Sequence, residues 1–163
     1  MERTLVLIKP DGVKRGLIGK ILNQYEEKSL EIVSLKMIIA TKDIAKKHYS
    51  EHAGKKFFDE LINYITEGKI CAIILMGEKA VDVVRKINGD KDPVKAELGS
   101  IRGKFTLDKT KNLVHASDSI ESAEHEIAIW FPELTSLQKH TYQDQYKGTV
   151  DLFSKTDGLL INV

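Results

Sequence analysis

The chain has 163 residues and a net charge of +1, with 42% hydrophobic and 30% charged residues. These values are typical of one globular domain, and the balanced charge argues against a nucleic-acid-binding or membrane-surface protein. No stretch approaches the roughly 20 apolar residues of a membrane helix, and the N-terminal apolar run is too short for a signal peptide. Cys71 is the only cysteine, which excludes an internal disulfide, and we expect a cytoplasmic protein.

The N-terminal half of the chain predicts strands and helices in alternation. Residues 4–8 form a continuous apolar run, as in a strand covered on both faces. Apolar residues at helical spacing predict one helix over residues 13–28. Residues 30–39 alternate between apolar and polar side chains, which indicates a strand at the edge of a sheet. Two further helices are predicted at residues 43–49 and 57–65.

The second half continues this order. Residues 69–76 predict a second buried strand, and residues 80–87 a helix. Residues 89–104 are predicted as one long loop, and loops of this length are often functional. The last strand is predicted at residues 113–115 and the last helix at residues 120–130. This order predicts an α+β fold: a ferredoxin-like sandwich in which helices cover a four-stranded antiparallel sheet.

The segment after the last predicted helix has a different composition. We predict a domain over residues 1–131 and a C-terminal extension over residues 132–163 that packs on the domain or on a neighbouring subunit. The extension is polar and then weakly apolar, and it contains no chemical motif.

His115 ends the last predicted strand, and Glu126 lies two turns into the helix that follows. A histidine alone is more often a core or surface residue. Here small neighbours leave room for a bulky group, and the first turn of a helix attracts anions. A carboxylate that holds one ring nitrogen would free the other nitrogen to attack. The pair is therefore a candidate nucleophile and its partner, with a base, a metal ligand or a structural link as alternatives.

Three cations stand near predicted strand or loop ends: Lys9, Arg85 and Arg102. Each alone is more often a surface charge. Together they suit a polyphosphate, because arginine offers a planar fork and lysine a point charge. The glycines fit no Walker A pattern, so a P-loop is not expected.

Metal binding by side chains is weakly supported. His48 and His52 are four residues apart, but no His-Glu-x-x-His pattern surrounds them, and we interpret both as surface histidines. We predict no metal ligands in the protein. A Mg²⁺ ion that arrives on substrate phosphates needs no protein cage.

Five segments carry a resemblance to a known family: "ERTLVLIKPDGVKRGLIG", "HYSEHAGKKFF", "RKINGDKDP", "GSIRGKF" and "NLVHASDSIESAEHEI". From Glu2 to Phe131 the chain resembles the nucleoside diphosphate kinases. The resemblance implies a kinase that moves the γ-phosphoryl group of a nucleoside triphosphate to Nδ1 of a histidine and then to a nucleoside diphosphate, in a ping-pong reaction. It also makes residues 1–131 the catalytic domain.

The resemblance implies a role for each matching residue. His115 is the phosphorylated histidine, and Glu126 holds the other side of its ring. Mg²⁺ bridges the substrate phosphates. The remaining residues serve the nucleotide: Lys9, Arg85, Arg102 and Asn112 contact phosphates and ribose, Tyr49 helps to position Lys9, and Phe57 stacks on the base.

The resemblance also implies an assembly of several subunits, and three positions of this chain differ from the family pattern. Family members form hexamers or tetramers, and Pro93 falls in a loop that helps to build the subunit contacts. Lys91 stands where the family has a threonine that touches phosphate, so we place Lys91 among the nucleotide-binding residues. Lys109 replaces an apolar residue opposite the base, and Ala116 replaces the commoner glycine, which fits if the backbone there has a negative φ.

Two alternatives compete with the kinase. A catalytically weak nucleotide-binding regulatory module of the same fold would lack the histidine or a phosphate contact, and this chain has both. A nucleic-acid-binding protein would need a basic stripe with aromatic platforms, which the sequence does not show. We therefore expect an enzyme that requires neither nucleic acid nor a membrane.

Overall fold

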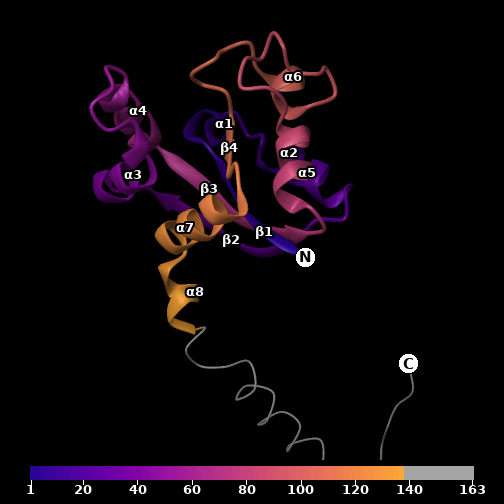
Figure 1. The fold of residues 1–163 in the computed structure, drawn as a ribbon. Coiled ribbons are helices and arrows are strands. Elements are labelled where there is room, and N and C mark those ends of the chain that lie inside the picture. Colours follow the sequence, from indigo (N-terminus) through magenta and orange to yellow (C-terminus); the bar gives the residue numbers. More distant parts are fainter. Residues whose placement is uncertain (138–163) are drawn as a thin grey trace, which may run out of the picture. The chain divides into compact units, whose positions relative to one another are not determined.

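The computed structural model describes residues 1–137, and these contain one antiparallel sheet with the strand order β2-β3-β1-β4 (Figure 1). The strands are β1 (Glu2–Ile8), β2 (Glu31–Ile39), β3 (Lys69–Gly77) and β4 (Val114–Ala116). Every neighbouring pair is antiparallel. The predicted four-stranded antiparallel sheet of a ferredoxin-like sandwich is confirmed.

Helices cover both faces of this sheet. The helices are α1 (Pro10–Lys14), α2 (Ile18–Glu26), α3 (Lys42–His48), η1 (Ser50–His52), α4 (Phe58–Thr66), α5 (Ala80–Asn88), α6 (Ile101–Phe105), α7 (Ile120–Trp130) and α8 (Pro132–Leu137). Figure 1 shows α3, α4 and α7 on one side of the sheet and α2 and α5 on the other. The candidate site around His115 lies on the side that α3, α4 and α7 cover.

The register of β1 explains where His115 points. Side chains alternate between the faces of a strand, and directly paired residues of neighbouring strands share a face. Val6 and Ile8 pack into the core beneath α2 and α5. Leu7 therefore faces the opposite side, and His115 is its direct partner on β4. The pairing directs His115 towards α3 and α7.

The prediction of one helix over residues 13–28 is wrong, because the chain forms two helices, α1 and α2. Gly16 adopts a φ of +67°. Its N–H donates to the carbonyl of Val13 at 3.0 Å, and the N–H of Leu17 donates to the carbonyl of Gly12 at 3.1 Å. This paired bonding ends a helix at a left-handed residue, for which glycine has no steric cost.

The loop predicted over residues 89–104 is also wrong at its end, where α6 forms. Ser100 caps α6, since its Oγ accepts from the N–H of Gly103 at 3.1 Å. A Cβ at Gly103 would collide with the carbonyl of Glu97, so only glycine lets the helix pack this closely. The resulting turn presents Arg102 to the interior.

Strand β2 confirms the predicted edge position, since it pairs with β3 alone among the described strands. Its apolar row points to solvent rather than to the core: the exposed fractions run from 41% to 59% for Val33, Leu35, Met37 and Ile39. A single chain therefore leaves both an open strand edge and an apolar row unpaired within residues 1–137.

Contacts divide the chain into two units, Met1–Trp130 and Phe131–Val163. The second unit contains α8, and the rest of the predicted extension, residues 138–163, lies outside the described residues. Within residues 1–137, no helix is both long enough and apolar enough to cross a membrane.

Candidate active site

Strand β4 and helix α7 bring His115 and Glu126 together, as the sequence predicts. Nε2 of His115 lies 2.9 Å from Oε1 of Glu126, and Oγ of Ser117 donates to Oε2 at 2.6 Å. Ser119 caps α7, because its Oγ accepts from the N–H of Ser122 at 3.0 Å. A carboxylate can only accept, so Nε2 of His115 carries the hydrogen and Nδ1 keeps a free lone pair.

The charge of Glu126 is maintained by its neighbours. Burial raises the pKa of this carboxyl, but the hydrogen bond and charge of His115, with His48 and Ser117, outweigh burial and hold the pKa below its usual value. Glu126 is therefore ionised at neutral pH and can stabilise positive charge on the His115 ring.

Lys9 is buried at the end of β1. Its Nζ donates to Oδ1 of Asn112 at 2.5 Å and to the carbonyl of Thr110 at 3.2 Å, and it lies 5.1 Å from the centre of the Tyr64 ring. Burial lowers the pKa of Lys9 to about 8, although the nearby Asp11 carboxylate opposes this effect. A second negative group, such as a phosphate, would stabilise the charged form.

A strained residue separates Asn112 from the strand that carries His115. Leu113 has a φ of +73°, a conformation that costs about 1–3 kcal/mol for a non-glycine residue. Its N–H donates to Oδ2 of Asp11 at 3.1 Å, and its carbonyl accepts from the N–H of Lys9 at 2.8 Å. These two bonds hold the kink, which lets Asn112 reach Lys9 directly before β4 begins.

Arg102 is buried and binds three backbone carbonyls, two from loops and one from β4. It donates to the carbonyl oxygens of Asn112 at 3.2 Å, Gly89 at 2.6 Å and Val114 at 2.7 Å. A guanidinium has five N–H groups, so two remain for a ligand. Arg102 therefore shapes the loops around His115 and can still bind an anion.

The side chain of Asn112 joins two loops that carry other predicted residues. Its Nδ2 donates to the carbonyls of Lys91 at 3.3 Å and Lys109 at 2.9 Å. Nζ of Lys109 forms an ion pair with Oδ2 of Asp92 at 2.8 Å. Two of the three positions that depart from the family pattern, Lys91 and Lys109, thus flank Asn112.

The remaining predicted site residues, Phe57, Arg85 and Tyr49, differ from one another in exposure. Phe57 is 48% exposed, and Arg85 is exposed on α5. Tyr49 is buried and packs edge-on against His48, with ring centres 4.5 Å apart. The tyrosine ring near Nζ of Lys9 is Tyr64, which the sequence analysis did not single out.

His48 is a further residue that the sequence analysis missed, and its interpretation as a surface histidine is wrong. Its ring is buried, its Nδ1 accepts from Nε1–H of Trp130 at 3.2 Å, and its centre lies 4.5 Å from that of His115. His48 follows Ile44 and Ala45 by four and three residues, so it lies on the apolar stripe of α3. That helical spacing was the signal that could have found it.

Three possible metal ligands lie close together in this cluster. One donor atom each of His48, His115 and Glu126 fall within 4.8 Å of one another. Trp130 already occupies Nδ1 of His48, and Glu126 already binds Nε2–H of His115. The geometry is that of a hydrogen-bonded imidazole network, and we assign no cation to it.

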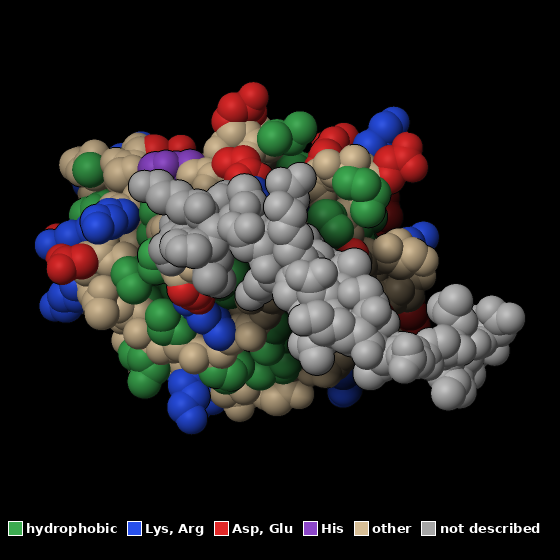
Figure 2. All heavy atoms as spheres, turned by 90° about the horizontal axis from the view of Figure 1, so that it is seen from below, with side chains coloured by type: hydrophobic (Ala, Val, Ile, Leu, Met, Phe, Trp, Pro, Cys, Tyr) green, Lys and Arg blue, Asp and Glu red, His purple; other side chains and the backbone are tan. Residues whose placement is uncertain are grey.

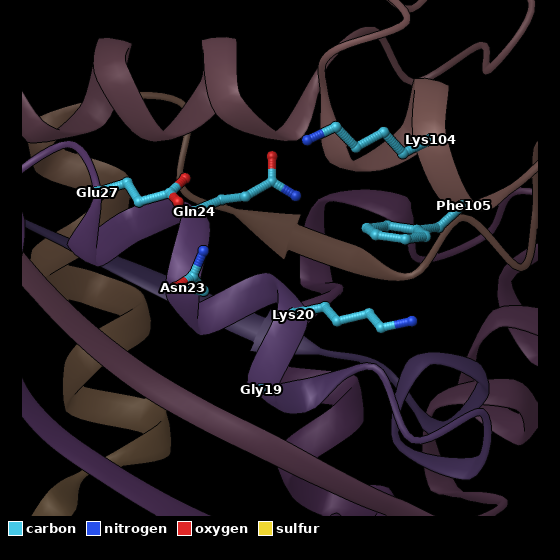
Figure 3. A pocket seen from close by; sticks show the side chains of 7 residues that line it. All are labelled: Gly19, Lys20, Asn23, Gln24, Glu27, Lys104 and Phe105. Carbon is cyan, nitrogen blue, oxygen red and sulfur yellow. The ribbon is translucent and has the colours of Figure 1, made fainter.

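An open pocket of about 450 Å³ lies between α2 and α6 (Figure 3). Its lining mixes cations, a carboxylate, amides and an aromatic ring: Gly19, Lys20, Asn23, Gln24, Glu27, Lys104 and Phe105. None of these is a predicted site residue. On the part of the surface in Figure 2 that grey atoms do not cover, basic and acidic side chains are interspersed with apolar ones, and no basic stripe is visible there.

The chain is similar in sequence to proteins of known activity. The family model for nucleoside diphosphate kinase matches residues 2–135. The chain is 55% identical over 134 residues to a nucleoside diphosphate kinase of Clostridium perfringens, covering 82% of this chain and 94% of that protein. It is 51% identical over 131 residues to one of Saccharolobus islandicus, covering 80% and 95%.

Solved structures are similar in fold and in sequence. A crystal structure of nucleoside diphosphate kinase from Encephalitozoon cuniculi has a TM-score of 0.79 and 38% identity, covering 80% of this chain and 89% of that one. A nucleoside diphosphate kinase family protein from Babesia bovis has a TM-score of 0.79 and 44% identity, covering 82% and 90%.

Proposed function

Because the chain belongs to the nucleoside diphosphate kinase family, we propose that it moves the γ-phosphoryl group of a nucleoside triphosphate to a nucleoside diphosphate through His115. One observation carries the assignment of the nucleophile. The ring of His115 is hydrogen-bonded at Nε2 by an ionised carboxylate, its Nδ1 keeps a lone pair, and its side chain is 24% exposed.

The transfer takes two steps at the same atom. In the first, Nδ1 of His115 attacks the γ-phosphorus, the bond to the bridging β,γ-oxygen breaks, and the nucleoside diphosphate leaves with that oxygen. In the second, a terminal β-phosphate oxygen of another diphosphate attacks the same phosphorus, and the N–P bond breaks. Glu126 keeps the hydrogen on Nε2 and stabilises positive charge on the ring in both steps.

The other predicted residues bind the nucleotide. Lys9, Arg102 and Asn112 form a buried group in which the lysine and the arginine offer donors to phosphate and ribose oxygens. Asn112 positions Lys9 through Oδ1, while both N–H groups of its amide bind the carbonyls of Lys91 and Lys109. Phe57 offers an exposed aromatic face to the base. Arg85 and Lys91 supply further positive charge from the exposed side of the site.

Tyr49 and the metal complete the proposal. Tyr49 packs behind the cluster, against His48, and helps to position the phosphate-binding groups. Mg²⁺ would be held by the phosphates of the nucleotide substrate, and it would supply positive charge there. The cations of the Lys9 group suit a phosphate rather than a bare metal ion, so this protein needs no metal cage. The cytoplasm, where nucleotides are exchanged, is the compartment that we propose.

We also propose a homo-oligomer, either a hexamer or a tetramer. The apolar row and open edge of β2 offer one surface for a second copy, because exposed strand edges pair readily. The loop of Pro93 offers another, since Val94 and Leu98 are 78% and 86% exposed. Light scattering tests this proposal: a mass of 18.4 kDa, that of one chain, would contradict it.

The proposed reaction is tested with γ-labelled ATP. We expect the protein to label itself with an acid-labile phosphohistidine and to lose the label to added GDP. A regulatory module of the same fold would bind the nucleotide without becoming labelled. Label on any residue other than His115 would contradict the assignment.

A further inference from the structure

His48 lies at the centre of the cluster behind the nucleophile. It is the last residue of α3, and its ring meets that of His115 nearly at right angles, with centres 4.5 Å apart and planes at 83°. Its Nδ1 lies 3.8 Å from Oε1 of Glu126 and accepts from Nε1–H of Trp130 at 3.2 Å. One ring therefore contacts the nucleophile and is held by a hydrogen bond from Trp130.

These contacts determine the hydrogen position on His48. A nitrogen that accepts a hydrogen bond cannot carry the hydrogen, so Trp130 places it on Nε2. Nε2 is buried and has no hydrogen-bond partner among the described residues. An unpaired buried N–H lowers stability. An apolar ring in the same place would instead remove the acceptor of Nε1–H of Trp130, so the imidazole both fills the space beside His115 and pairs the indole.

His48 also stays neutral, which matters for its neighbours. Burial lowers its pKa to about 3; the charges of His115, His125 and His52 act in the same direction, and Glu126 opposes them. A charged His48 would compete with His115 for the Glu126 carboxylate. A neutral ring leaves that carboxylate to His115 and Ser117.

We propose that His48 is a positioning residue for His115: its edge holds the plane of the nucleophilic ring, and Trp130 anchors His48 in the orientation that does so. The proposal rests on the proposed function of His115. His48 is buried beside His115. It acts by keeping Nδ1 of His115 in line with the phosphorus while Glu126 binds Nε2.

Alignment of this kind has a large effect on rate. Attack requires the lone pair of Nδ1 to point at phosphorus, and a misplacement of about 1 Å can cost on the order of 10²-fold in rate. Without an edge against its face, the His115 ring could turn about its bond to Cβ. It would then lose either the in-line approach at Nδ1 or the hydrogen bond to Glu126.

Two substitutions separate the ring edge from the hydrogen bond. His48→Asn keeps an acceptor for Trp130 but removes the ring. His48→Phe keeps the ring edge but removes the acceptor. We expect His48→Asn to lower kcat on the order of tenfold with unchanged KM, and His48→Phe to retain most of kcat, because orientation rather than binding is affected.

A spectroscopic measurement distinguishes positioning from a general loss of structure. Correlation of side-chain ¹H and ¹⁵N signals reports the tautomer of each histidine. In the wild-type protein we expect His48 to be neutral with hydrogen on Nε2 from about pH 5 to 8, given its low pKa. We expect one tautomer of His115 in the wild type and in His48→Phe, and a mixture in His48→Asn.

A matched control accounts for lost stability. Ile21→Val removes one buried methylene beneath α2, on the opposite face of the sheet, and should lower stability without changing kcat or the His115 tautomer. The proposal is overturned if His48→Asn keeps the wild-type kcat, or if both His48 variants lose kcat equally while His115 keeps its tautomer. Failure of the wild-type protein to label His115 would instead overturn the proposed function.

Discussion

The two sides of the candidate site differ in burial and in hydrogen bonding. On the imidazole side, Glu126 uses both carboxylate oxygens, and His48 and Trp130 are buried behind His115. On the nucleotide side, Lys9, Arg102 and Asn112 are buried, but the end proposed to bind the base is not: Phe57 is 48% exposed, and the Lys109 amine pairs with Asp92 at the surface. The imidazole is pre-organised, and the base-binding end is open.

This difference matches the two tasks of the reaction. Attack at phosphorus needs one ring orientation, which buried hydrogen bonds and packing provide. Acceptance of several bases needs a surface that favours none of them, and an exposed aromatic face provides this. Substitutions on the imidazole side should therefore reduce kcat, and those on the nucleotide side should mainly raise KM.

His115→Gln should have the largest effect. Glutamine cannot carry the phosphoryl group, so self-labelling and turnover should both be abolished while nucleotide affinity stays nearly unchanged. Labelling by γ-labelled ATP and calorimetric binding of ADP measure the two properties separately. Retained labelling at another residue would break the comparison, because the nucleophile would then lie outside the imidazole side.

Glu126→Ala should reduce kcat by about 10²-fold without abolishing it, the lower end of what a positioned proton partner contributes. KM should change little, because Glu126 contacts His115 and Ser117 rather than the nucleotide. Single-turnover labelling rates test this. A variant as inactive as His115→Gln would show that Glu126 also supports the fold.

Phe57→Ala should raise KM for every diphosphate and spare kcat. Base stacking is worth roughly 1–3 kcal/mol and tolerates all bases. We expect ADP, GDP, CDP and UDP to discharge phospho-His115 with catalytic efficiencies within about two decades in the wild type, since strong discrimination needs paired polar contacts to the base. Discharge by one diphosphate alone would show that the nucleotide side is also pre-organised.

Lys9 should give a pH dependence that belongs to the nucleotide side alone. Its pKa is about 8, so the side chain is charged below that pH and loses its charge as pH rises through it. We expect kcat/KM, which reports the free enzyme, to decline above about pH 8. The kcat should hold to higher pH, because bound phosphate favours the charged lysine. A flat kcat/KM profile to pH 9.5 would contradict this.

Lys109→Val should have the smallest effect. Its amine pairs with Asp92 at the surface, and such pairs contribute little. We expect a small rise in KM, most visible for GDP because a lysine can contact a ring carbonyl. Asp92→Asn, which frees Lys109, is the matched control and should not raise KM for GDP. A large loss for all four bases would place Lys109 on the phosphates instead.

The sequence by itself predicted the sheet and its edge strand, and it made His115 and Glu126 a candidate pair. Apolar runs and alternation indicate buried strands directly, whereas spacing alone did not establish the contact between these two side chains. The sequence pattern did not predict where turns begin and end helices. Gly16 divides one predicted helix into two, and α6 forms within a predicted loop.

Only the tertiary structure decided the surroundings of the nucleophile. His48 and Trp130 are 82 residues apart, and Lys9 and Asn112 are 103 apart, so their bonds exist only once the sheet brings α3, α7 and the loop before β4 together. A histidine on an amphipathic helix is compatible with either solvent or core, and packing chooses between them. Sequence patterns indicate which residues can react, whereas burial and long-range contacts decide their orientation and charge.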